Sequence, residues 1–140
     1  MRIEKCVVSY DDWEMQCCGD PFKIGDRIKW PVYKRVDEDN IDTDSALDGV
    51  DYIYEAHGMK HPRDMYTLIG TVDEIKADYY KIELRTRLSI HNGQKPVPTH
   101  VYEKSFDVTE ADGWDKDIDD LEFGSYRVTI RDCELLPYKE

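Results

Sequence analysis

Two adjacent cysteines, Cys17 and Cys18, are the residues of this sequence best suited to chemistry. Zinc sites in proteins are built from cysteine thiolates and histidine imidazoles in a tetrahedral array. The best imidazole partners are His57 and His61, whose spacing of four residues places both rings on one face if that segment is helical. A candidate zinc site with four ligands is therefore formed by Cys17, Cys18, His57 and His61.

The spacing of the two cysteines leaves two other interpretations open. Zinc sites usually use cysteines separated by two residues, whereas adjacent residues on an extended chain point to opposite faces. Free cysteine is among the most buried residue types, so Cys17 and Cys18 also fit structural positions in the core and beneath the His57 loop. A reactive thiol activated by His57, with Glu55 or Asp26 orienting the imidazole, is the third interpretation.

The composition restricts the class of protein and of partner. A chain of 140 residues fits a single domain, 1–140, with a core of its own. The net charge of −12 disfavours nucleic acids and anionic membranes, because both attract proteins mainly through basic residues. No apolar run approaches the roughly 18–20 residues of a membrane span, and the sequence begins without an apolar secretory segment. We therefore expect a cytoplasmic protein whose four cysteines are reduced.

The elements that position these residues are predicted to be β-strands. Alternation of apolar and polar residues with period two is typical of half-buried strands. A turn at Ala77-Asp78 predicts a hairpin in the middle of the chain, and a break in the alternation predicts a bulge near Asp132. The predicted strands are 3–10, 22–32, 68–75, 80–90, 99–108 and 126–135.

Two acidic stretches are predicted to be loops. Residues 37–51 carry seven acids and no base, and residues 109–122 carry seven acids and one lysine. Such charge runs are typical of solvated segments, and short helices are compatible with 45–57 and 115–122. Arg85 and Arg87 of the predicted strand 80–90, with Arg127 and Arg131 of the predicted strand 126–135, would form a basic stripe if the two strands are neighbours. Pairing with nearby acids is the simpler interpretation.

These strands and loops predict a small all-β fold, an SH3-like barrel with long acidic loop insertions. Five or six short strands with a closing C-terminal strand are typical of small barrels. The pattern from Phe22 to Trp30 resembles the opening strand of SH3-like barrels, and the pattern from Gly70 to Leu84 resembles their central hairpin. The acidic stretch 33–67 is then an insertion in the first loop. A likeness in architecture carries no function by itself.

The sequence also resembles a known family from residue 1 to about residue 137. The residues that carry the resemblance are Trp13, Cys17-Cys18-Gly19, Pro21-Phe22, Gly25-Asp26 and Trp30, followed by Glu55, His57-Gly58 and Gly70-Thr71-Val72. This combination is similar to a group of small bacterial proteins classed as a domain of unknown function. The resemblance implies a bacterial cytoplasmic protein and supplies no mechanism.

The expected function is that of a non-enzymatic binding or interaction module whose partner is a protein or peptide. Its candidate binding surface is Trp13, Cys17, Cys18 and His57, since aromatic grooves between the loops of small barrels take peptides. No cofactor is expected apart from zinc, in the alternative of a zinc-binding protein. A thiol-dependent enzyme using Cys17 or Cys18 is a further alternative. An acidic mimic of nucleic acid that meets a basic partner would use the net charge alone.

Overall fold

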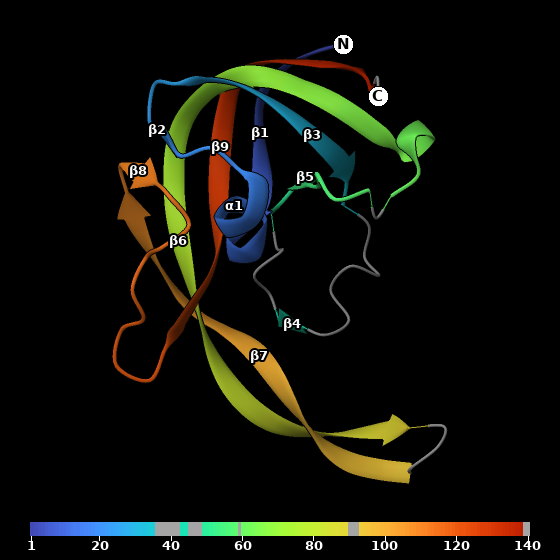
Figure 1. Cartoon of the computed structure of the whole chain (residues 1–140), viewed down its shortest axis with the longest axis vertical. Coiled ribbons are helices and arrows are strands. Elements are labelled where there is room, and N and C mark those ends of the chain that lie inside the picture. The colour runs from blue at the N-terminus through green and yellow to red at the C-terminus, as the bar shows by residue number, and fades with distance from the viewer. Residues whose placement is uncertain (36–42, 45–48, 59, 90–92, 139–140) are drawn as a thin grey trace.

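The computed structural model describes residues 1–35, 43–44, 49–58, 60–89 and 93–138, and the backbone alone at 18, 43–44, 84–89 and 93–100. Strands make up most of this part of the chain (Figure 1). The elements are β1 (Arg2–Asp11), α1 (Asp12–Cys18), β2 (Phe22–Lys23), β3 (Arg27–Lys34), β4 (Thr43–Asp44), β5 (Tyr52–Tyr54), the 3-10 turn η2 (Pro62–Asp64), β6 (Met65–Ser89), β7 (Gly93–Val108), β8 (Glu110–Ala111) and β9 (Glu122–Pro137).

Five strands close into a barrel. Their order is β3-β5-β1-β9-β6, and β6 pairs with β3 to complete the circle. All neighbours are antiparallel except β1 and β5, which run parallel. The predicted small β-barrel is therefore confirmed, and its closure is consistent with the SH3-like type. The short strands β2 and β8 pair with each other in a separate sheet.

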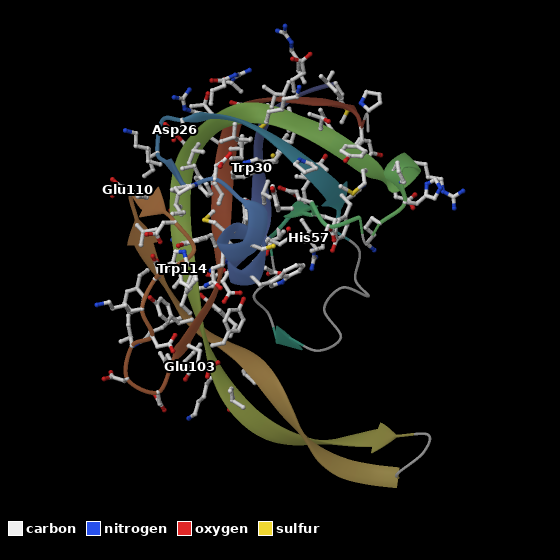
Figure 2. All side chains as sticks on the ribbon, viewed as in Figure 1. Asp26, Trp30, His57, Glu103, Glu110 and Trp114 are labelled. Carbon is white, nitrogen blue, oxygen red and sulfur yellow. The ribbon has the colours of Figure 1, made fainter. Side chains whose placement is uncertain are left out.

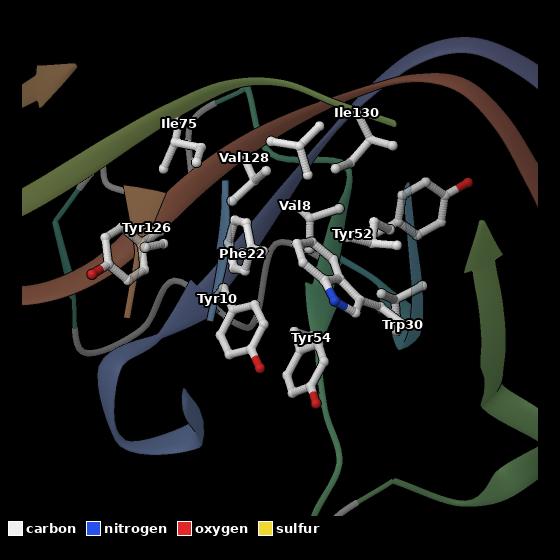
Figure 3. Packing of buried hydrophobic residues seen from close by; sticks show 14 of the residues in the cluster. Val8, Tyr10, Phe22, Trp30, Tyr52, Tyr54, Ile75, Tyr126, Val128 and Ile130 are labelled. Carbon is white, nitrogen blue, oxygen red and sulfur yellow. The ribbon is translucent and has the colours of Figure 1, made fainter. Parts of the chain in front are cut away.

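The barrel encloses an aromatic-rich core (Figure 3). Tyr126, Val128 and Ile130 of β9 are fully buried, as their alternation predicts. Tyr10 of β1 stacks on Tyr54 of β5, with ring centroids 3.9 Å apart. Such a pair contributes about 0.5–1.5 kcal/mol beyond the burial of its area. Because α1 follows β1 and a loop follows β5, this contact holds the starting points of both segments close together.

The middle of the chain corrects the predicted hairpin. Ala77 and Asp78 do not form a turn, because they are fully buried residues within β6, which continues through 25 residues. The Asp78 carboxylate accepts a hydrogen bond of 2.9 Å from the Arg127 guanidinium of β9, and this ion pair allows an acid to lie inside the sheet. The hairpin lies later, between β6 and β7, where Ser89 pairs with Gly93.

Other predicted segments are partly right. The predicted strand 22–32 is divided by a turn at Gly25, whose φ of 95° suits glycine. A helix at 45–57 is wrong where the structure describes this segment, because Tyr52–Tyr54 form β5. Asp132 has a φ of 53° and lies at a shift of register between β6 and β9, so the predicted bulge is confirmed.

The acidic segments follow the prediction of loops only in part. No helix forms at 115–122, where Ile118 and Leu121 exchange backbone hydrogen bonds across a turn. The other acidic stretch, 37–51, lies mostly outside the described residues. The strands predicted at the two ends of the chain are confirmed as β1 and β9. Within the part of the chain that the structure describes, no helix has the length and apolar character needed to cross a membrane.

Beyond Tyr80, β6 and β7 leave the barrel as a two-stranded ribbon (Figure 1). We call the paired residues 81–89 and 93–101 the hairpin arm. The last pair between β6 and β9 joins Tyr80 to Glu122. Among the described residues, the arm therefore has no further strand beside it except the two-residue β4, which pairs with β7 near the root of the arm.

Candidate metal centre

Helix α1 follows β1 directly and carries three residues of the candidate site, Trp13, Glu14 and Cys17. Asp12 and Glu14 lie in its first turn, where the helix dipole favours acids. Glu14 and Cys17 are three residues apart, so their side chains lie on the same side of the helix. Gly19 ends the helix, and its N–H donates to the Glu14 carbonyl over 3.1 Å.

Close packing of this turn on the barrel requires glycine at position 19. A Cβ atom there would lie 2.1 Å from the Tyr10 hydroxyl oxygen and 3.0 Å from the Cα of Met15. Tyr10 and Met15 are both buried in the core, where close packing leaves little room for either to move. Gly19 therefore seats the C-terminal turn of α1, and Cys17 with it, against β1.

The loop after β5 brings Glu55 and His57 to the helix. The Glu55 N–H donates to the carbonyl of Pro31 in β3 over 3.0 Å, which fixes the start of the loop. The Glu55 carboxylate accepts the backbone N–H of His57, and Gly58 follows with a φ of 72° that suits glycine. This tight turn places His57 on the side of the barrel where α1 lies (Figure 2).

Glu14, Glu55 and His57 converge at this point. The Nδ1 atom of His57 lies 2.7 Å from Oε2 of Glu14. One ligand atom from each of the three residues lies within 4.8 Å of the other two. Glu14 is 2% exposed and Glu55 is 7% exposed, whereas the His57 side chain is 24% exposed. Two carboxylates are thus buried next to an imidazole that reaches the surface.

The pKa values of the cluster reflect this crowding. Burial, followed by repulsion from Glu55, raises the pKa of Glu14 above its ordinary value of 4.5, although hydrogen bonds from His57 and the Ala56 backbone oppose the rise. A hydrogen bond with Cys17 is the main reason that the pKa of His57 lies above 6.5, and the contact with Glu14 adds to it. Protons on Glu14 and His57 weaken the effect of the repulsion between the two carboxyl groups, and a bound cation would have the same effect.

The structure brings together three residues of the predicted binding surface. The rings of Trp13 and His57 lie 4.7 Å apart, and Cys17 contacts the same imidazole. Trp13 is 44% exposed, so this surface faces solvent. The side chain of Cys18 lies outside the described residues. The role of this surface in binding a protein or peptide stays a prediction.

The predicted zinc ligands are not all brought together. His61 is not in the described cluster, because its Nδ1 accepts the Arg63 N–H over 3.2 Å at the start of η2. No helix joins His57 to His61, since the described residues between them form a bend with Gly58 at positive φ. The assumption that both imidazoles share a helical face is therefore wrong.

Glu14 is the member of the cluster that the sequence prediction missed. Glu55 and Asp26 were the acids expected to orient His57, but the ring contacts Glu14, and Glu55 accepts the His57 backbone N–H. Asp26 instead accepts the Lys23 N–H over 3.0 Å within its own turn. The signal for Glu14 is its spacing of three residues from Cys17, which has meaning only if this segment is a helix.

Comparison with known families supports the part of the sequence resemblance that concerns a family of unknown function. A model described as a family of unknown function, DUF6578, matches residues 4–132. The chain belongs to this family. No curated protein and no solved structure matches the chain. The family has no assigned activity, so the function of this DUF6578 domain must be argued from its own residues.

The other two described cysteines of the DUF6578 domain lie in the core, away from this cluster. The sulfur atoms of Cys6 in β1 and Cys133 in β9 are 3.5 Å apart, and both residues are buried free thiols. Burial raises the pKa of each thiol, which keeps it protonated and unreactive at neutral pH. Cys6 and Cys133 are therefore buried structural thiols. The same interpretation was open for Cys17, but Cys17 is exposed.

Proposed function

We propose that this protein binds a divalent transition-metal ion at Glu14, Glu55 and His57, with the Cys17 thiolate as a fourth ligand. The observation that carries the proposal is the convergence of two buried carboxylates and one imidazole, with ligand atoms within 4.8 Å of one another. Buried charges in proteins are usually paired or coordinate metals. The site replaces the set Cys17, Cys18, His57 and His61 that the sequence suggests, and it keeps two members of that set.

The charge balance of the cluster supports a cation. Two carboxyl groups face a single imidazole, so a cluster with both carboxyl groups ionised carries one more negative charge than a protonated His57 can balance. A divalent ion would neutralise both carboxylates and leave His57 neutral, which is the form that binds metals. Repulsion from the nearby Glu55 is one cause of the raised pKa of Glu14, and a bound cation would remove this repulsion.

The donor types favour zinc over calcium or magnesium. Calcium and magnesium prefer a shell of oxygen atoms, whereas an imidazole and a thiolate are ligands of zinc and related transition metals. Zinc–ligand distances of about 2.0–2.3 Å place tetrahedral ligand atoms roughly 3.3–3.8 Å apart. The three donors lie within 4.8 Å, so small side-chain rotations suffice, and the hydrogen bond between His57 and Glu14 gives way to the ion.

Zinc competition with a chromophoric chelator tests the proposal. We expect one equivalent of zinc to bind, and we expect Glu55→Gln and His57→Ala each to weaken the affinity by about tenfold or more. His61→Ala is the matched control, because it removes an exposed histidine outside the cluster and should leave the affinity unchanged. Absence of zinc binding, or an equal loss in the control, would overturn the proposal.

Cobalt substitution tests the role assigned to Cys17. Cobalt(II) bound to a thiolate gives an intense charge-transfer band in the near ultraviolet, and this band is absent when only oxygen and nitrogen bind. We expect the band in the wild-type protein and its loss in Cys17→Ser, with cobalt still bound more weakly by the remaining donors. A band that persists in Cys17→Ser would assign the thiolate to another cysteine.

A second candidate function, thiol-dependent chemistry, is supported by one specific observation. His57 contacts both Cys17 and Glu14, which is the order of groups in a cysteine–histidine–acid site. The position of Cys17 in the last turn of α1 opposes it, because the negative end of the helix dipole disfavours a thiolate. Alkylation of Cys17 faster than that of a model thiol at neutral pH, in metal-free protein, would favour this candidate.

A further inference from the structure

We propose that the hairpin arm of this protein docks on the acidic loop 109–122 of a second copy of the same chain. The inference concerns association of the chain with itself, and it is independent of metal binding. It combines three features: a rigid root for the arm, a basic arm on an acidic protein, and an acidic loop with exposed apolar side chains.

The root of the arm is fixed by a buried polar network. The Arg127 guanidinium of β9 donates to both carboxylate oxygens of Asp78 in β6, at 3.0 and 2.9 Å. It also donates to the hydroxyl groups of Tyr102 and Ser105 in β7, at 3.1 and 2.5 Å. Asp78 is fully buried, so these charge-assisted bonds are strong and directional. One arginine thus joins three strands where the arm begins.

A second contact holds the same point of the arm. The hydroxyl groups of Tyr80 and Ser125 are 2.8 Å apart, and both residues are buried. A Cβ atom at Gly124 would lie 2.7 Å from the Tyr80 ring, so this glycine allows the ring to lie flat on β9. Together with the Arg127 network, this packing fixes the direction in which the arm leaves the barrel.

Among the residues that the structure describes, only the short β4 pairs with the arm beyond its root. An isolated two-stranded ribbon is marginally stable in water, because neither face is covered. Ile82, on the arm, is 46% exposed. Nine residues of β6 extend the arm by about 30 Å at the usual strand rise. A ribbon of this length therefore gains stability from a partner that covers it.

The charge of the arm is opposite to that of the rest of the chain. Residues 81–101 contain four basic side chains and one acidic one, which gives a net charge of +3. The whole chain carries −12, so the remainder carries −15. The charged residues of the arm are Lys81, Glu83, Arg85, Arg87 and Lys95. A strongly acidic surface is therefore the partner that the arm complements.

Pairing by addition of a strand is blocked on one edge of the arm. Pro96 and Pro98 lie in β7, and a proline in a paired strand removes an N–H from the free edge. Charged residues on an edge strand also discourage such pairing. Addition of a strand along β7 is therefore disfavoured, and the proposal relies on the charge of the arm instead.

The acidic loop 109–122 supplies the complementary surface. It carries seven acids and one lysine, and it also exposes Trp114 by 67% and Ile118 by 36%. The loop is ordered, since the Tyr79 hydroxyl donates to the Lys116 carbonyl over 2.9 Å. Acidic groups around an exposed tryptophan combine electrostatic attraction with an aromatic anchor, as protein interfaces do.

The geometry of one molecule directs the arm to a second copy. The arm extends away from the barrel, and the paired far ends of β6 and β7 lie on the other side of the view from the segment that follows β8 (Figure 1). Figure 2 labels Glu110 in β8 and Trp114 in the segment after it. The loop ends at Glu122 beside the root of the arm, but the far ends of β6 and β7 lie away from the acidic loop of their own chain in this arrangement. Two copies that each place an arm on the loop of the other form a closed dimer with twofold symmetry.

Sedimentation equilibrium at low and high salt tests this proposal. We expect a dimer at low salt that dissociates as salt screens the charges. The arm variant Arg85→Glu/Arg87→Glu and the loop variant Asp120→Lys/Glu122→Lys should each be monomeric alone. An equimolar mixture of the two variants should form a mixed dimer, because each arm then meets a loop of opposite charge. A chain that carries all four substitutions restores complementarity and should be dimeric again. This charge-swap recovery distinguishes a specific contact from a loss of folding.

The control is Lys29→Glu/Lys34→Glu, which changes the net charge of the chain as the arm variant does but at exposed positions of β3 in the barrel. We expect this control to remain dimeric. A wild-type chain that is monomeric at every concentration and salt would overturn the proposal, as would a four-substitution chain that stays monomeric. A monomer whose arm binds duplex DNA, with loss of binding in Arg85→Glu/Arg87→Glu, would overturn it in favour of a nucleic-acid partner.

Discussion

The Nδ1 atom of His57 lies 2.7 Å from Oε2 of Glu14, and this contact joins the loop after β5 to the helix after β1. Glu14 is 2% exposed, so its charge has almost no water to stabilise it. In the metal-free protein the imidazole supplies part of that stabilisation. Both groups have raised pKa values, which determines how the stability of the fold depends on pH.

The free energy of unfolding of metal-free protein should decrease as pH rises above 4.5. Glu14 keeps its proton to higher pH in the folded chain than in the unfolded chain, whose value is near 4.5, and His57 does the same from 6.5. Stability falls with rising pH wherever the folded state binds more protons. The contribution of protonated His57 is complete below 6.5 and is lost as pH passes through its folded pKa. Urea unfolding with a chelator present, over a series of pH values, measures this dependence.

The double variant Glu14→Gln/His57→Asn is the control for this pH dependence. Gln keeps the shape of Glu14, Asn keeps a polar group near the position of the His57 Nδ1 atom, and both titrating groups are removed, so the curve should flatten. Asp11 also titrates in this range, because burial raises its pKa to about 6. A curve that stays equally steep in the double variant would assign the pH dependence to Asp11 or another acid instead of the pair.

Zinc should reverse the sign of this dependence. Metal ligands must lose their protons, so binding strengthens as pH rises through the pKa values of Glu14 and His57. A ligand that binds only the folded state stabilises it by an amount that grows with affinity. The increase in melting temperature caused by one equivalent of zinc should therefore be larger at pH values above the folded pKa of His57 than below it. A shift independent of pH would argue against His57 and Glu14 as ligands.

The sequence predicts the barrel better than it predicts the candidate site, for a physical reason. Alternation along β9 reports which side chains face the core, and burial of Tyr126, Val128 and Ile130 confirms it. Alternation says nothing about a partner far away in the chain. Asp78 looks like a turn residue because its partner, Arg127, is 49 residues away and converts it into part of a strand.

The same limit applies to the cluster around His57. Cys17 and His57 could be chosen from their residue types, and the structure brings them into contact. Glu14 could not be chosen from its residue type, because acids are abundant in this chain and α1 is too short to show a clear helical pattern. His61 was chosen on an assumed helix that the structure does not contain. Only the packing of the loop after β5 against α1 shows that Glu14, among the many acids of the chain, is the one that contacts His57.

Substitution of Gly19 by alanine should destabilise the protein and weaken zinc binding. The new methyl group would meet the Tyr10 hydroxyl at 2.1 Å, and overpacking of this kind costs about 1–3 kcal/mol. Movement of the last turn of α1 would also displace Cys17. Urea unfolding and zinc titration measure the two effects. Addition of Tyr10→Phe removes the clashing oxygen and should recover part of both losses, whereas no recovery would place the strain elsewhere, for example at Met15.

The ion pair between Arg127 and Asp78 should contribute to stability in a way that depends on both partners. Asp78 is fully buried, so Arg127→Met leaves an uncompensated charge and should cost about 3–5 kcal/mol. The double variant Asp78→Leu/Arg127→Met removes both charges and should recover most of that loss, because apolar replacement of a buried pair is often neutral. Arg131→Met is the matched control. Its side chain is 45% exposed and faces the half-buried Asp73, so its loss should cost less than about 1 kcal/mol. Equal costs for Arg127→Met and Arg131→Met, measured by urea unfolding, would show that the buried network does not hold the root of the arm.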